Sequence, residues 1–189
     1  MKNPTRLAFS LCILTISILV LVVDESPGRA NEPAAVAHGQ AAAPEVPPST
    51  TVPEARARAV LLYESMHGAL QVAHRDLFDE DDAHAIPSAS LEDVFDALAE
   101  QYSVELKWLI VETDIVNVDH QADDEFEKAA VVALKAGKPR HEAVEPSRYR
   151  FAGPIRLASQ CLKCHVKHRT STEDRTAGLL ISMPLRLDQ

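Results

Sequence analysis

The spacing of apolar and polar positions predicts a domain that opens with two helices. Residues 54–79 contain no proline and one glycine, and their apolar side chains recur at the spacing of one helix face. Those positions are Val60, Tyr63, Met66, Leu70, Ala73 and Leu77. A second helix is expected from Ser90, which with Asp93 forms a capping pattern, to about Tyr102.

Three further segments have the pattern of β-strands. In residues 104–111, apolar residues alternate with polar ones over the first half and become continuous in the second half. Residues 149–157 and 177–185 are also apolar enough to form strands. Between the first two lies an expected helix over residues 123–137, which starts with acidic residues and ends at a glycine. The expected order is helix, helix, strand, helix, strand, loop, strand, which indicates an α+β fold.

The segment before this domain has a different composition. Residues 31–52 are rich in Ala, Pro, Glu, Ser and Thr and include four prolines. Such a segment buries too little apolar surface to order itself, so we expect a disordered linker there and one domain over residues 53–189.

Residues 1–30 have the pattern of an export signal. Lys2 and Arg6 precede an unbroken apolar run over residues 7–23. Residues 24–30, which end at Ala30, have the small-residue pattern of a cleavage site, so cleavage is expected after Ala30. Because the run is long for a signal and short for a membrane span, both a cleaved signal peptide and an uncleaved N-terminal membrane anchor stay open. Either one predicts an exported domain, in the periplasm or on the outer face of the cytoplasmic membrane.

The charge of the chain limits the classes of partner. It carries 19 basic and 28 acidic side chains, for a formal net charge of −9. This charge speaks against binding to nucleic acid and favours a basic partner at low salt. No recognisable catalytic set is present in the sequence, so we expect a protein that is not an enzyme.

The most specific chemical signal is Cys161-Leu162-Lys163-Cys164-His165. Two thiols three positions apart can each bond to one vinyl group of a porphyrin, and the histidine that follows can then bind the iron, which is the pattern of covalent haem c attachment. A CxxC redox pair would not need His165. A zinc site would need two more ligands, for which His168 and a distant histidine are candidates. We therefore expect one haem c per chain, with Cys161 and Cys164 as thioether residues and His165 as the proximal iron ligand.

The residues around this motif resemble the PAS-like c-type haem domain family, a group of exported single-haem domains. The resemblance rests on residues 152–157 before the motif, residues 177–184 after it, residues 123–126 and residues 67–71. It covers about residues 55–185. It implies a PAS-like antiparallel sheet flanked by helices, a long N-terminal helix, a haem-attachment loop near the C-terminus, and a role in electron transfer or redox sensing. Many members use a cysteine after the first helix as the second iron ligand, and Ala89 occupies that position here.

The sixth ligand must therefore come from another residue, or the site is open. His67 and His74 lie two turns apart on one face of the first expected helix, in line with Tyr63 and Leu70. We prefer His74 and keep His67 as the second candidate; two surface histidines are the alternative. The other candidates are two methionines, Met66 and Met183. The remaining histidines are less suitable. His38 lies in the linker and His168 lies too close to His165. Expected polar loops contain His84, His120 and His141.

The leading hypothesis is an exported monohaem cytochrome c that transfers one electron at a time to an unidentified redox partner protein. The alternative is a haem-based redox or gas sensor that acts through a separate partner. Peroxidase chemistry and a colourless zinc module are the two remaining interpretations. The long N-terminal helix would also allow a homodimer.

Overall fold

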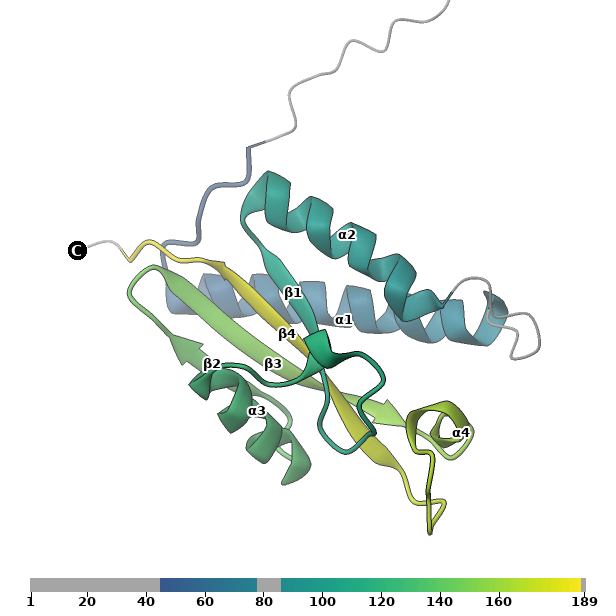
Figure 1. Ribbon diagram of the computed structural model, residues 1–189. Coiled ribbons are helices and arrows are strands. Elements are labelled where there is room, and N and C mark those ends of the chain that lie inside the picture. Colours follow the sequence, from purple (N-terminus) through teal and green to yellow (C-terminus); the bar gives the residue numbers. More distant parts are fainter. Residues whose placement is uncertain (1–44, 78–85, 188–189) are drawn as a thin grey trace, which may run out of the picture. The chain divides into compact units, whose positions relative to one another are not determined.

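The computed structural model describes residues 45–77 and 86–187, in which helices cover both faces of one antiparallel sheet (Figure 1). This is the α+β, PAS-like architecture that the sequence predicted. The expected signal or anchor, most of the expected linker and His84 lie outside the described residues. Within the described ranges, no helix combines the length and the apolar composition that crossing a membrane requires.

The sheet contains four strands in the order β1-β4-β3-β2, all antiparallel. Their bounds are β1 Glu105–Leu109, β2 His141–Val144, β3 Arg148–Leu157 and β4 Arg175–Pro184. The two central strands, β3 and β4, pair along ten positions, from Arg148 opposite Pro184 to Leu157 opposite Arg175. Both are covered by helices on each face, which is why their middle residues, 151–155 and 177–183, are almost all apolar.

Helices α1 (Val52–Leu77) and α2 (Pro87–Tyr102) pack on one face of this sheet. The buried face of α1 carries Ala55, Ala59, Tyr63 and Leu70, at the spacing of a single helix stripe. These side chains share one core with residues from α2 and alternate positions of the strands: Phe95, Trp108, Phe151, Leu179 and Ile181. This shared core therefore fixes the position of α1 along β3 and β4.

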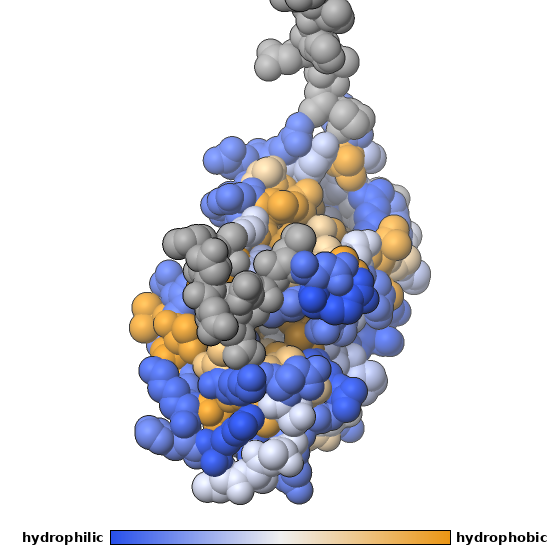
Figure 2. All heavy atoms as spheres, turned by 90° about the vertical axis from the view of Figure 1, so that its right-hand side faces the viewer, coloured by the Kyte–Doolittle hydropathy of each residue, from blue (hydrophilic) through white to orange (hydrophobic). Residues whose placement is uncertain are grey.

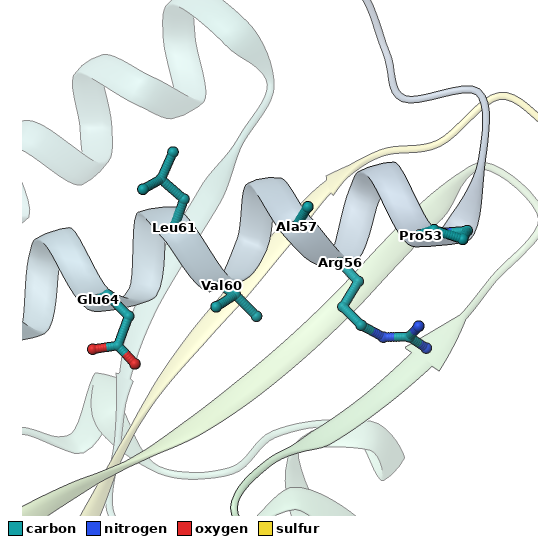
Figure 3. Close-up of a pocket in the computed structure, with 6 residues that line it drawn as sticks. All are labelled: Pro53, Arg56, Ala57, Val60, Leu61 and Glu64. Carbon is teal, nitrogen blue, oxygen red and sulfur yellow. The ribbon is translucent and has the colours of Figure 1, made fainter.

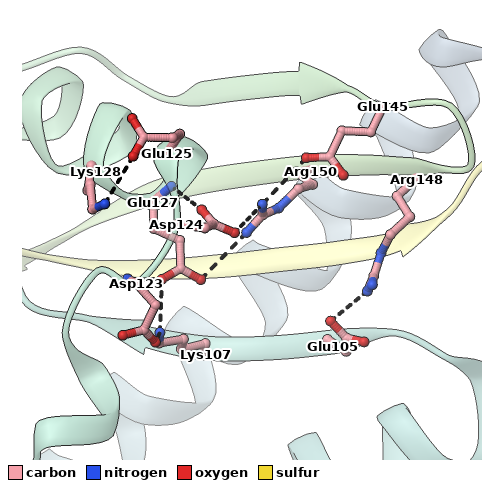
Figure 4. A network of polar contacts seen from close by, with 10 residues as sticks. All are labelled: Glu105, Lys107, Asp123, Asp124, Glu125, Glu127, Lys128, Glu145, Arg148 and Arg150. Atoms are coloured by element: carbon pink, nitrogen blue, oxygen red, sulfur yellow. Dashed lines mark hydrogen bonds and ion pairs between the residues drawn. The ribbon is translucent and has the colours of Figure 1, made fainter.

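Helix α3 (Glu125–Lys135) covers the opposite face. Its first turn is capped by Asp124, whose side chain accepts a 2.8 Å hydrogen bond from the N–H of Glu127, as its acidic start predicted. The carboxylate of Glu127 is buried and lies 2.9 Å from Lys107 Nζ on β1 and 3.5 Å from Arg150 on β3 (Figure 4). Buried charges of opposite sign thus join α3 to two strands of the sheet.

Four details differ from the expectations. Strand β2 was not predicted, because its four residues at the sheet edge show no clear alternation; His141 therefore lies in a strand and not in a polar loop. Strand β1 ends at Leu109, since the N–H of Ile110 turns to the carbonyl of His120. Helix α2 begins at Pro87, three residues before Ser90, without a side-chain cap.

The fourth difference concerns the expected linker. Ser49 is buried, forms an isolated bridge to Leu185, and accepts a 2.8 Å hydrogen bond from the N–H of Arg186. The carbonyl of Pro47 also accepts a 2.7 Å hydrogen bond from Arg58, so the chain contacts the folded domain several residues before α1 begins at Val52.

Candidate functional site

The CxxCH motif lies in the connection between the two central strands. Residues 162–165 form a single helical turn, α4 (Leu162–His165), with Cys161 at its start. The N–H of His165 donates a 3.2 Å hydrogen bond to the carbonyl of Cys161. Cys161, Cys164 and His165 are spaced as neighbours on one side of such a turn, so the two thiols and the imidazole share a face.

Leu162 anchors this turn to the protein. Its side chain is fully buried and belongs to the core that α1 shares with the sheet. Cys161 and Val166 pack against the same core and are partly buried, whereas Cys164 is exposed. Both thiols are free. The turn therefore has an apolar inner side and two cysteines that are available for covalent attachment.

The loop that follows β1 holds the other end of the turn. The N–H of Asp114 donates a 3.0 Å hydrogen bond to the carbonyl of His165, and the carboxylate of Asp114 accepts a 2.6 Å bond from the N–H of Lys167. Sequence reasoning missed Asp114, because a single acidic residue in a loop carries no local signal of a contact 53 positions away. Its two hydrogen bonds hold the backbone at His165 and at Lys167, two residues further on.

His74 lies near His165 in space. Burial lowers the pKa of His165 below its usual range, and His74, when it is protonated, adds a smaller lowering. Salt screens such a charge beyond a Debye length of about 10 Å, so His74 on α1 lies within roughly that distance of His165. His74 Nδ1 lies 3.2 Å from the carbonyl oxygen of Leu70. Because a carbonyl only accepts, Nδ1 donates, and the lone pair that a metal would need is on Nε2.

His67 has different surroundings. Its ring centroid lies 5.5 Å from that of Tyr63, and its Nε2 lies 3.4 Å from Nε2 of Gln71, both on α1. Of the two candidate histidines, His74 thus has an electrostatic effect on His165, and His67 contacts neighbours on its own helix. His168 is exposed on the segment after α4.

The two methionine candidates also occupy distinct places. Met183 is buried at the far end of β4, eight positions from Arg175, which is roughly 26 Å at the usual rise of a strand. Met66 is partly buried against the same core as Leu162. Met183 is therefore a core residue remote from the motif.

Among residues 45–77 and 86–187, the structure shows no cluster of potential metal ligands. In these ranges no three His, Cys, Asp or Glu side chains converge as ligands for a metal ion. A shallow depression of about 550 Å³ lies on the N-terminal half of α1, as Figure 3 shows, and contains no residue of the motif. It is lined by Pro53, Arg56, Ala57, Val60, Leu61 and Glu64. Hence the chemistry-bearing residues gather at α4 and not in this depression.

Comparison with known proteins gives a consistent result. The model of the Tll0287-like family matches residues 48–179, most of the described domain. Among solved structures, the crystal structure of the cyanobacterial haem protein Tll0287 superposes with a TM-score of 0.56 at 12% sequence identity, covering 74% of this chain and all of that one. No curated protein sequence matches. On the extent of the family match, the chain belongs to the Tll0287-like family.

Proposed function

We propose that this chain is an exported c-type cytochrome that carries one covalently attached haem and transfers single electrons to a redox partner protein. The observation that carries the proposal is the single turn α4, in which the spacing of Cys161, Cys164 and His165 puts all three on one side. The relative Tll0287 is a haem protein with the same fold, which supports haem binding here.

The residues present fit this cofactor. Free thiols at i and i+3 match the two attachment points of a porphyrin, and the next residue supplies an imidazole. The side chains of Leu70, Leu157 and Leu162 are buried in the core that adjoins the turn, which provides the apolar surroundings that a porphyrin ring requires. The haem, when bound, supplies a one-electron couple at its iron.

The protein residues have separate tasks. Cys161 and Cys164 would hold the ring covalently, and His165 would bind the iron on the proximal side. His74 would bind on the distal side through Nε2, because its Nδ1 proton is directed to Leu70. The hydrogen bonds of Asp114 would keep His165 in place. Two strong ligands of this kind leave no open iron position, which favours electron transfer over binding of small molecules.

The experiment is expression with an export signal and cytochrome c maturation factors, followed by spectra of the oxidised and dithionite-reduced protein, a pyridine haemochrome and a redox titration. We expect a c-type haemochrome, a sharp low-spin reduced band and one reversible one-electron transition. A haem that is high-spin and binds CO tightly would support the sensor alternative instead. A colourless protein that contains zinc would overturn the proposal.

A further inference from the structure

The segment that carries the motif is basic, although the chain as a whole is acidic. Residues 158–172 contain Lys163, Lys167 and Arg169 and no Asp or Glu. All three side chains are exposed. Since the formal net charge of the chain is −9, the charge of this segment is opposite in sign to the net charge of the chain.

Two acidic residues of the loop after β1, Glu112 and Asp114, are directed into the protein, whereas Glu173 and Asp174, which follow the segment, are exposed. The carboxylate of Asp114 accepts from the N–H of Lys167, and that of Glu112 accepts a 3.1 Å hydrogen bond from the N–H of Thr176. Both residues are partly buried, whereas the three basic side chains are exposed. Asp174 is paired with Arg156, so the exposed charge on α4 and on the residues directly after it is mainly basic.

An exposed apolar patch lies beside these basic residues. Ile115, Val116 and Val118 follow Asp114 directly in the chain, and 53%, 69% and 64% of their surfaces are exposed. Figure 2 looks onto the side of the molecule that carries α4 and shows hydrophobic side chains exposed next to hydrophilic ones. Because Asp114 is hydrogen-bonded to His165 and to Lys167, the patch has a fixed position relative to α4.

Resting on the proposed function, we propose that this face is the docking surface for a redox partner protein with an acidic surface. The face consists of an apolar centre, Ile115, Val116 and Val118, and a basic rim, Lys163, Lys167 and Arg169. An apolar centre with a charged rim is the usual composition of a small, transient protein interface. The basic rim attracts an acidic partner and orients it toward the site of electron transfer. The net charge alone favoured a basic partner, but the local charge at α4 has the opposite sign.

The test uses four oxidants with the reduced holoprotein. Two are small ions, anionic hexacyanoferrate(III) and cationic tris(phenanthroline)cobalt(III); two are proteins, an acidic plastocyanin and the basic mitochondrial cytochrome c. We expect the two anionic oxidants to react faster at low ionic strength than at high, by about tenfold, which is the reverse of what a net charge of −9 would produce.

Variants locate the effect. Lys163→Glu with Lys167→Glu should slow the reaction with both anionic oxidants by about tenfold at low salt. The matched control is Lys135→Glu with Lys138→Glu, which makes the same change in net charge at exposed positions on and just after α3, and should leave the rates nearly unchanged. Val116→Ser should slow the reaction with plastocyanin only, since a small ion does not need the apolar centre.

The outcomes separate the two proposals. A reversible couple whose reactions with anionic oxidants are unaffected by the Lys163 and Lys167 changes, or equally slowed by the control pair, would overturn the docking surface and leave the proposed function intact. A protein that reacts with none of the four oxidants would overturn the proposed function and the docking surface with it.

Discussion

The backbone N–H of Asp114 donates a 3.0 Å hydrogen bond to the carbonyl of His165, and so joins the loop after β1 to the end of α4. The same residue also accepts from Lys167 through its carboxylate. One loop residue thus holds the main chain at the expected proximal ligand and two residues after it, although it does not belong to the motif.

Replacing this carboxylate should loosen the turn. In Asp114→Ala the N–H of Lys167 loses its acceptor, which should cost about 1 kcal/mol and speed exchange of that amide. Asp119→Ala, at an exposed position of the same connection, is the matched control. Hydrogen exchange followed by NMR measures the effect, and unchanged protection of Lys167 would show that the hydrogen bond does not form in solution.

Removing each candidate distal histidine should give different spectra. We expect His74→Ala to convert a low-spin haem to a high-spin form that binds CO, because His74 approaches His165. His67→Ala should stay low-spin, since His67 contacts Tyr63 and Gln71. Absorption and electron paramagnetic resonance spectra distinguish the two. The reverse pattern would transfer the distal role to His67.

Two glycines offer a matched test of packing. A Cβ added at Gly153 would lie 2.4 Å from the Tyr63 ring, whose hydroxyl is hydrogen-bonded to Pro154. Gly153→Ala should therefore destabilise the fold by about 1 to 3 kcal/mol. Gly68 lies in α1 with no atom within 4 Å of the added group, so Gly68→Ala should stabilise it by about 0.5 to 1 kcal/mol. Urea denaturation measures both, and equal effects would contradict this packing.

The stability of the fold should depend on pH through the ionisation of the Glu142 carboxyl. Hydrogen bonds from Arg56 hold the pKa of this carboxyl below its usual range, although burial opposes the effect, and Tyr149 also donates to it. A lowered pKa in the folded state means that the stabilisation is present above the ordinary pKa of glutamate, about 4.3, and is lost as the pH falls through the folded pKa.

The matching variant is Glu142→Gln. It should be less stable than the parent chain at pH 7, and the difference should shrink as the pH falls from about 5 toward 3. Glu125→Gln, at an exposed residue of α3, serves as the control because its ion pair with Lys128 lies on the surface. Denaturation curves at several pH values provide the measurement. A difference that stays constant over this range would contradict the role given to the Arg56 contact.

Local sequence patterns predicted the elements whose signal is contained in their own residues. The apolar stripe of α1 and the apolar runs of β3 and β4 are examples, and so is the acidic start of α3. The start of α2 was misplaced because Ser90 offers a capping side chain, whereas Pro87 fits the first helical position and the helix forms three residues earlier. Strand β2 was missed because its extended conformation depends on pairing with β3, which its own four residues do not indicate.

The same distinction applies to the candidate site. The CxxCH motif is recognisable because its chemistry is contained in five consecutive residues. The choice between His67 and His74 depends on how α1 lies along the sheet, which no spacing within the helix reveals. Asp114 is tied to residues more than fifty positions away, so only the folded chain shows its contacts.

The motif occupies a hairpin connection whose two arms differ in length. Leu157 and Arg175 are opposite each other at the base, and three residues, 158–160, separate β3 from Cys161, whereas nine, 166–174, separate His165 from β4. Because the short arm has only three residues, the position of Cys161 relative to the sheet is nearly fixed. The long arm has enough residues to span the same distance after its length changes. Insertions and deletions should therefore be tolerated between Lys167, which is hydrogen-bonded to Asp114, and β4, and excluded between β3 and Cys161.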